Sequence, residues 1–296
     1  MNTNLKNTVL IGKLSITNWE AKKKAKSVER AAESAAGATS GTISARKALL
    51  PGAEALEDIL KHSAAMRTWW NTVSAPWFDN GMRAYNVAGH MDIVTAYGDM
   101  ARHRELLINE FLDEYPALRE QARFSLNDLF DEADYPLPEV VKARFTHSFE
   151  CMPLPDTADF RVVEGVDPAE LARLQADAEA RAQARVQEAM GATVMRLTET
   201  LRTLADRLAR YSENETAQVK GNRFYESWVD NVKELAGLLP QLNLVGDPTI
   251  AAVTAEIEQV FDKPALHYRD SFEDRTAATK KATELSARLA ALFAAD

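Results

Sequence analysis

Carboxylates, histidines and one cysteine are the groups in this sequence that could carry out chemistry. General acid–base catalysis would require carboxylates that converge in a cleft with separated pKa values. The densest acidic group comprises Asp128, Asp131, Glu132 and Asp134. Turn and capping residues surround this group, so we expect a solvated loop and no catalytic pair.

The histidines and the cysteine do not show the pattern of a metal site. The histidines are His62, His90, His103, His147 and His267, and none has the i, i+4 spacing of a zinc-binding helix. Cys151, the one cysteine, can form neither an internal disulfide nor a thiolate zinc cluster. Its strand-like neighbours favour a buried structural thiol. We therefore expect no catalytic residue and no metal.

Motifs for cofactor chemistry are missing as well. The sequence has no GxxxxGK[ST] loop, no GxGxxG after a strand and no GxSxG turn. These absences predict no cofactor and a chain that is not an enzyme. A pocket lined by His147 with converging carboxylates would revive the enzyme hypothesis.

The clearest pattern is a run of apolar residues with spacings of 4, 3, 4, 3, 4 and 3. We call this run the seam; it comprises Met190, Val194, Leu197, Leu201, Leu204, Leu208 and Tyr211. Such spacing places one residue per turn on a narrow face of an α-helix, which another helix covers. The cover comes either from later helices of the same chain or from a second copy in a coiled coil.

The first 165 residues combine short strands with helices. We expect strands over 8–17, 42–51, 82–87, 145–152 and 159–163, and helices over 20–36, 53–73 and 91–122. The segments 8–17 and 42–51 resemble a hairpin-like pair with a helical insertion. Pro116 predicts a kink or a break in the third helix, and Pro138 begins a short helix.

A long helix begins at Asp167-Pro168, where an N-cap residue precedes a proline at the first helical position. Further helices are expected over 224–239, 248–261 and 268–295, with ends at Pro240 and Pro264. The predicted fold is α+β and mostly helical. Residues 1–165 form a domain with a small antiparallel sheet, and residues 166–296 form a helical bundle with a coiled-coil-like helix.

Charge is distributed unevenly along the chain. The net charge is −9, but residues 1–50 contain nine Lys and Arg against three Asp and Glu. An acidic body repels phosphate backbones, so a dedicated nucleic-acid binder is disfavoured. If nucleic acid is bound, the candidate contacts are Lys22, Lys23, Lys24, Lys26, Arg30, Arg46 and Lys47.

The sequence has no run of about 18 consecutive apolar residues, so we expect no membrane span. Its first residues lack the pattern of a secretion signal. We therefore expect a cytoplasmic protein, located in the host cytoplasm if a phage encodes it.

Four stretches resemble an uncharacterised domain family of bacteria and their phages. They are the first strand up to Trp19, residues 130–163, residues 224–248 and the long helix between the last two. The most specific residues are Tyr135-Pro136, Asn231 and the sequence LNLVGDP. The resemblance implies no established activity. It also implies genes that lie beside a MoxR-type AAA+ ATPase and a von Willebrand A protein.

These observations favour an adaptor that recognises partners by its surface, self-associates through helices and works with an AAA+ ATPase. A second hypothesis is a phage accessory protein that binds DNA through the basic N-terminal segment. A third is a structural component of a virion or another large assembly.

Overall fold

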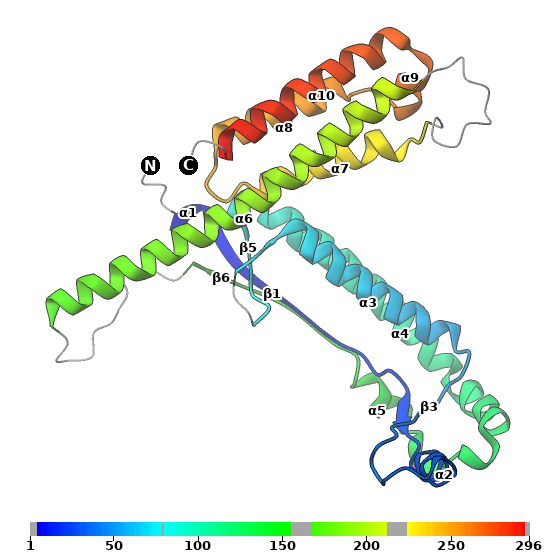
Figure 1. The fold of residues 1–296 in the computed structure, drawn as a ribbon. Coiled ribbons are helices and arrows are strands. Elements are labelled where there is room, and N and C mark those ends of the chain that lie inside the picture. The colour runs from blue at the N-terminus through cyan, green and yellow to red at the C-terminus, as the bar shows by residue number, and fades with distance from the viewer. Residues whose placement is uncertain (1–4, 78–79, 155–166, 212–223, 294–296) are drawn as a thin grey trace. The chain divides into compact units, whose positions relative to one another are not determined.

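The structure is a computed structural model that describes residues 5–77, 80–154, 167–211 and 224–293. It confirms the α+β, mostly helical fold, with a small four-stranded antiparallel sheet in the N-terminal half and long helices in the C-terminal half (Figure 1). In the described residues, no helix combines the length and apolar character needed to cross a membrane.

The helices are α1 (Leu5–Thr8), α2 (Lys26–Ala36), α3 (Glu54–Val73), α4 (His90–Leu126), α5 (Pro138–Lys142), α6 (Pro168–Arg210), α7 (Ser227–Leu242), α8 (Pro248–Val260), α9 (Ala265–Asp270) and α10 (Phe272–Phe293). The strands are β1 (Val9–Thr17), β2 (Lys22–Lys24), β3 (Arg46–Ala48), β4 (Ala75–Pro76), β5 (Arg83–Asn86) and β6 (Thr146–Pro153). The four-stranded sheet has the order β4-β5-β1-β6, and β2 pairs with β3 separately.

The chain divides into two compact units that are both discontinuous in sequence. Unit 1 contains residues 1–13, 71–93 and 151–296, and unit 2 contains residues 14–70 and 94–150. This division differs from the predicted split at residue 165. The reason is that part of β1, together with β4 and β5, packs in the same core cluster as the C-terminal helices.

The sheet of unit 1 follows the alternation predicted for its first strand. Val9 and Ile11 are each 1% exposed and face the core. β1 and β5 run antiparallel, with Val9 opposite Asn86. The Asn86 side-chain amide donates to the Asn243 carbonyl oxygen at 2.5 Å, which joins β5 to the end of α7.

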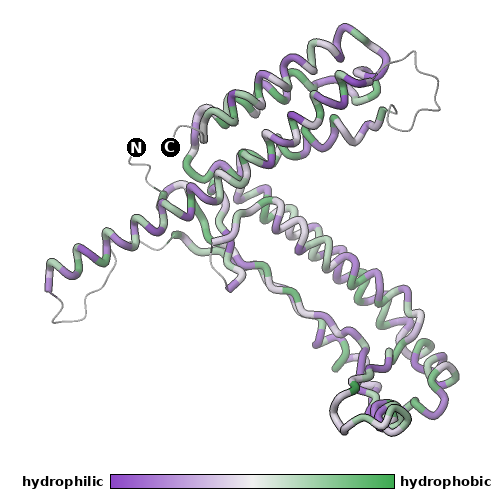
Figure 2. The backbone as a smooth tube through the Cα atoms, in the orientation of Figure 1, coloured by the Kyte–Doolittle hydropathy of each residue, from purple (hydrophilic) through white to green (hydrophobic). Residues whose placement is uncertain are grey.

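The helical part of unit 1 is a bundle in which α6 packs against α7 and α10, and α8 packs against α7 and α10. The start of α6 is as predicted, because the Asp167 carboxylate accepts a hydrogen bond from the Ala169 amide at 3.1 Å and Pro168 takes the first helical position. Apolar and polar residues are interspersed along these helices (Figure 2), and the buried ones recur at helical spacing. Each helix therefore offers one face to the core.

Unit 2 is built on α3 and α4, with Ile59, Phe111 and Tyr115 buried in its core. Of the kink or break expected near Tyr115, the break does not occur, because α4 continues through Pro116 to Leu126. Phe111 and Tyr115 lie just before Pro116 and are almost fully buried, so packing holds the helix in register where one backbone hydrogen bond is lost.

Other boundaries also differ from the sequence prediction. The helix expected over 20–36 is shorter because Ala21 has a positive φ of 49°, and Lys22–Lys24 form β2 instead. The partner of β3 is therefore β2, with Lys22 opposite Ala48, and not the first strand. Helix α7 continues past Pro240 to Leu242. The strand expected over 159–163 lies outside the described residues.

Candidate functional site

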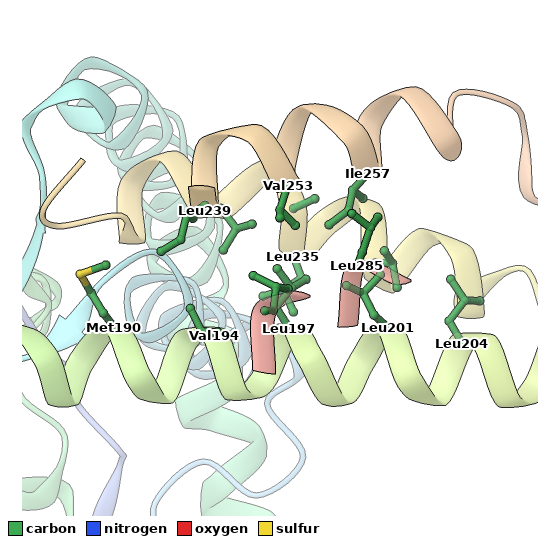
Figure 3. Close-up of a cluster of buried hydrophobic side chains, with 14 of the residues drawn as sticks. Met190, Val194, Leu197, Leu201, Leu204, Leu235, Leu239, Val253, Ile257 and Leu285 are labelled. Atoms are coloured by element: carbon green, nitrogen blue, oxygen red, sulfur yellow. The ribbon is translucent and has the colours of Figure 1, made fainter. Parts of the chain in front are cut away.

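The seam of α6 is covered from within the chain. Six of its residues, from Met190 to Leu208, are between 0 and 4% exposed. Their side chains meet apolar residues of α7, α8 and α10, which include Leu235, Leu239, Val253, Ile257 and Leu285 (Figure 3). A face filled in this way cannot also receive a second copy, so the intrachain alternative describes this seam.

Tyr211 ends the seam and lies outside its buried part. It is the C-cap residue of α6 and is half-buried. Its ring lies 5.4 Å from the ring of Phe224, and the Arg275 guanidinium lies 4.9 Å from its centre. The tyrosine therefore belongs to an aromatic cluster at this end of the bundle.

A groove lies between α6 and α7, on the side of α6 next to the seam. It has a volume of about 340 Å³. Its lining residues are Arg196, Glu199, Thr200, Thr203, Leu204, Arg207, Trp228 and Asn231. All of them belong to unit 1. We call this feature the α6–α7 groove.

The position of the groove follows from helix geometry. Arg196, Thr200, Thr203 and Arg207 each come directly before a seam residue and repeat with the seam's spacing of 4, 3 and 4. They form a second stripe, rotated by about 100° from the seam. Because α7 covers the seam, this polar stripe lies along the edge of the α6–α7 contact.

Two side chains of α7 complete the groove. Trp228 and Asn231 are three residues apart and so lie on the same face of α7. The Arg207 guanidinium lies 5.4 Å from the centre of the Trp228 ring, within the range of a cation–π interaction. This contact orients a cation at one end of the groove.

The groove has the chemistry of a binding site. Arg196 and Arg207 are exposed, and Thr200 and Thr203 lie half-buried between them. The Thr200 hydroxyl donates to the Arg196 carbonyl oxygen at 2.7 Å, which leaves its oxygen as an acceptor. Histidine and cysteine are absent from the described lining, in which Glu199 supplies the carboxylate.

The groove was not predicted from the sequence. Two of its lining residues had been named for other reasons, Leu204 as part of the seam and Asn231 in the family resemblance. The available signal was the flanking stripe on α6, which repeats as regularly as the seam. Its pairing with Trp228 could not be read from the sequence because it depends on how α7 packs.

Some of the candidate nucleic-acid contacts form ion pairs within unit 2, and the others lie on its surface. Lys23 and Lys47 both form ion pairs with Asp134, whose side chain is 2% exposed, and the Lys47–Asp134 distance is 2.6 Å. Burial opposes ionisation of Asp134, but hydrogen bonds from the two lysines outweigh it and lower the pKa of this carboxyl. Two of the seven candidates therefore hold unit 2 together.

The remaining candidates lie on the surface of unit 2. Lys24 lies 3.6 Å from a Glu29 carboxylate oxygen. Lys22, Lys26, Arg30 and Arg46 are exposed. Lys22, Lys24 and Arg46 belong to the β2–β3 pair, whereas Lys26 and Arg30 lie on α2. Part of the basic segment thus lies on the β2–β3 pair, and Glu29 partly neutralises the charge of Lys24.

The carboxylates between residues 128 and 134 do not converge on a cleft. Asp131 accepts a hydrogen bond from the Ala133 amide, and Glu132 pairs with Arg119 and Arg123. Asp134 is bound to the two lysines described above. Asp131, Glu132 and Asp134 therefore have capping or ion-pairing partners, and the burial of Asp134 corrects the expectation of a fully solvated loop.

His147 has more polar neighbours than the sequence suggested. The Tyr97 hydroxyl lies 2.7 Å from Nδ1 of His147, and a Glu105 carboxylate oxygen lies 3.6 Å from Nε2. Burial raises the pKa of Tyr97, whereas the charge of Arg104 opposes this shift. These contacts place one hydroxyl and one carboxylate beside the imidazole.

Arg104 is the largest fully buried side chain in the described residues. It donates to the Ser63 hydroxyl at 3.2 Å, the Thr17 carbonyl at 2.9 Å and the Asn18 side chain at 2.8 Å. Burial lowers the pKa of this guanidinium. These bonds fasten the end of β1 to α3 and α4, which is a structural role.

The other sequence candidates for chemistry do not form a metal-binding group in the described residues. The rings of His62 and His103 lie 4.8 Å apart, but no group of three metal-binding side chains is found among the described residues. Cys151 is exposed, which corrects the expected buried thiol. Cys151, Met152 and Pro153 are all exposed, so neither face of β6 is covered at this end of the strand.

Comparison of the chain with family models, curated proteins and solved structures finds no match.

Proposed function

We propose that this chain is a non-enzymatic interaction protein, an adaptor, which binds a partner in the α6–α7 groove. The observation that carries this proposal is the groove itself, where two exposed arginines, two threonines and Trp228 line one hollow. Aromatic and arginine side chains are enriched in protein-binding sites.

In this proposal the groove binds the partner, because the seam is buried and cannot do so. The seam supplies the stability of the bundle, because its side chains are buried against α7, α8 and α10. The neighbouring stripe is held in place by that packing and remains accessible. In this proposal, a rigid core positions a polar recognition surface.

The resemblance described above implies an AAA+ ATPase as a partner, and we include this in the proposal. An adaptor without catalytic groups would leave energy-dependent steps to such a separate motor. The contacts of Lys23 and Lys47 with Asp134 weigh against the alternative of nucleic-acid binding through the basic segment.

Site-specific photo-crosslinking in the native host tests this function. A photoreactive residue at Thr203, inside the groove, is compared with one at Glu188, which is exposed elsewhere on α6. We expect a defined protein adduct at position 203 that is absent at position 188 and that re-forms from purified components. Equal adducts at both positions, or none at position 203, would refute the proposal.

A further inference from the structure

We infer that the α6–α7 groove binds an acidic helical segment of a partner polypeptide. This inference rests on the proposed function, and it specifies the chemistry of the partner.

The separation of the two arginines indicates a polypeptide. Arg196 and Arg207 are eleven residues apart on one straight helix. At a rise of 1.5 Å per residue, their Cα atoms are separated by about 16 Å. A single small anion meets both guanidinium groups only if the two side chains bend toward each other along the helix, and Arg207 is instead held against the Trp228 ring. A polypeptide that carries two separate carboxylates can pair with both guanidinium groups.

The backbone of the groove favours a helix over an extended strand. Peptides that bind as strands gain affinity from main-chain hydrogen bonds with an exposed sheet edge. The walls here are α6 and α7, whose backbone groups are bonded within each helix away from the ends. Three turns of a helix span about eleven residues, so carboxylates at i and i+11 match the two arginines.

The charge of the groove selects an acidic occupant. Of the described lining residues, Glu199 alone carries a negative charge, and its carboxylate lies 3.3 Å from the guanidinium of Arg202. Arg196 and Arg207 therefore leave the groove positive on a chain whose net charge is −9. That net charge repels a polynucleotide, whereas a short acidic helix contacts only the positive groove.

The described lining of the groove includes two apolar side chains, Leu204 and Trp228. Trp228 is half-buried beside Arg207, and Leu204 follows Thr203 on α6, between the two arginines in sequence. Thr200 and Thr203 are small, so they leave space between the arginines. An occupant with apolar side chains between its two carboxylates fits this arrangement.

Fluorescence anisotropy with designed peptides tests the inference. The probe is a labelled alanine-based helix with Glu at i and i+11 and Leu at i+4 and i+7. The peptide controls carry Lys at i and i+11, or Glu at i and i+6, which places the two charges on different faces. A single-stranded DNA oligonucleotide measures general affinity for polyanions.

Two protein variants with the same change in charge complete the design. Arg196→Glu with Arg207→Glu reverses the groove, whereas Arg181→Glu with Arg210→Glu reverses two exposed arginines of α6 outside it. We expect the groove variant to bind the i, i+11 peptide about tenfold more weakly than wild type, and the control variant to bind it within about twofold. Circular dichroism establishes that both variants are folded.

Several results would overturn the inference. They are absence of peptide binding at about 1 mM, equal binding of the two Glu spacings, equal losses in both variants, or stronger binding of the DNA. If the crosslink at position 203 identifies a partner but the acidic helix does not bind, the inference fails and the proposed function stands. If neither is observed, both fail.

Discussion

Truncation of one seam residue tests whether the seam supports the bundle from within the chain. Leu201 is 0% exposed and packs in the core that α6 shares with α7, α8 and α10. Leu201→Ala removes three buried carbon atoms and leaves a cavity, which costs about 2–5 kcal/mol for well-packed leucines. A loss of about 3 kcal/mol changes the unfolding equilibrium by about 150-fold.

The matched control is Met195→Ala, because Met195 is 73% exposed on the same helix. We expect that change to alter stability by less than about 0.5 kcal/mol. Native-state hydrogen exchange measured on peptides of α6, α7 and α10 reports the stability of unit 1 separately from that of unit 2. Light scattering on the same samples gives the molecular mass.

The reasoning would be refuted if Leu201→Ala and Met195→Ala had the same small effect on exchange. It would also be refuted if Leu201→Ala converted an oligomer into a stable monomer. The second result would mean that another molecule covers the seam.

Three further predictions concern particular contacts. Gly89→Ala should destabilise unit 1 by about 1–3 kcal/mol in chemical denaturation, because the new Cβ would lie 2.2 Å from Cγ of Gln241. Gly237→Ala in α7 should stabilise unit 1 by up to about 1 kcal/mol, because a Cβ there meets nothing within 4 Å. A loss of stability in Gly237→Ala would contradict this packing. Folding lowers the pKa of Asp134 below 3.8, so the stabilisation by its carboxylate is complete above pH 3.8 and declines as the pH falls through the lowered pKa. Asp134→Asn should therefore lower the urea midpoint at pH 7, and the midpoints of variant and wild type should converge at low pH. A difference in urea midpoint that stays constant with pH would refute the ion pairs. Hydrogen bonds from the His267 imidazole and the Lys263 ammonium group lower the pKa of the Asp274 carboxyl to about 2, which carbon NMR can measure. An ordinary pKa near 3.8 would contradict those bonds.

The sequence predicted the helices well because their signals are local. The seam spacing, the Asp167 N-cap and the proline that follows it lie within one helix, and each appears in the structure as expected. The sequence left two covers for the seam open, later helices of the same chain or a second copy, because a spacing pattern defines a face and not its partner.

The contacts that the sequence did not reveal join distant parts of the chain. Lys47 and Asp134 look like solvated charges when each is considered with its neighbours, yet they form a buried ion pair. The groove was missed for a similar reason, since Arg196 and Arg207 flank the seam and such positions are usually solvated. The exposure of Cys151 depends on which parts of the chain cover the faces of β6, and local composition does not encode this.

The central claim is that this protein acts by recognition through the α6–α7 groove. The most direct test is the affinity of the partner identified by crosslinking at position 203 for three purified proteins: wild type, Arg196→Glu with Arg207→Glu, and Arg181→Glu with Arg210→Glu. We predict that reversal of the groove weakens binding about tenfold or more and that the control variant binds as wild type does. Equal affinity of all three proteins for that partner would contradict the claim.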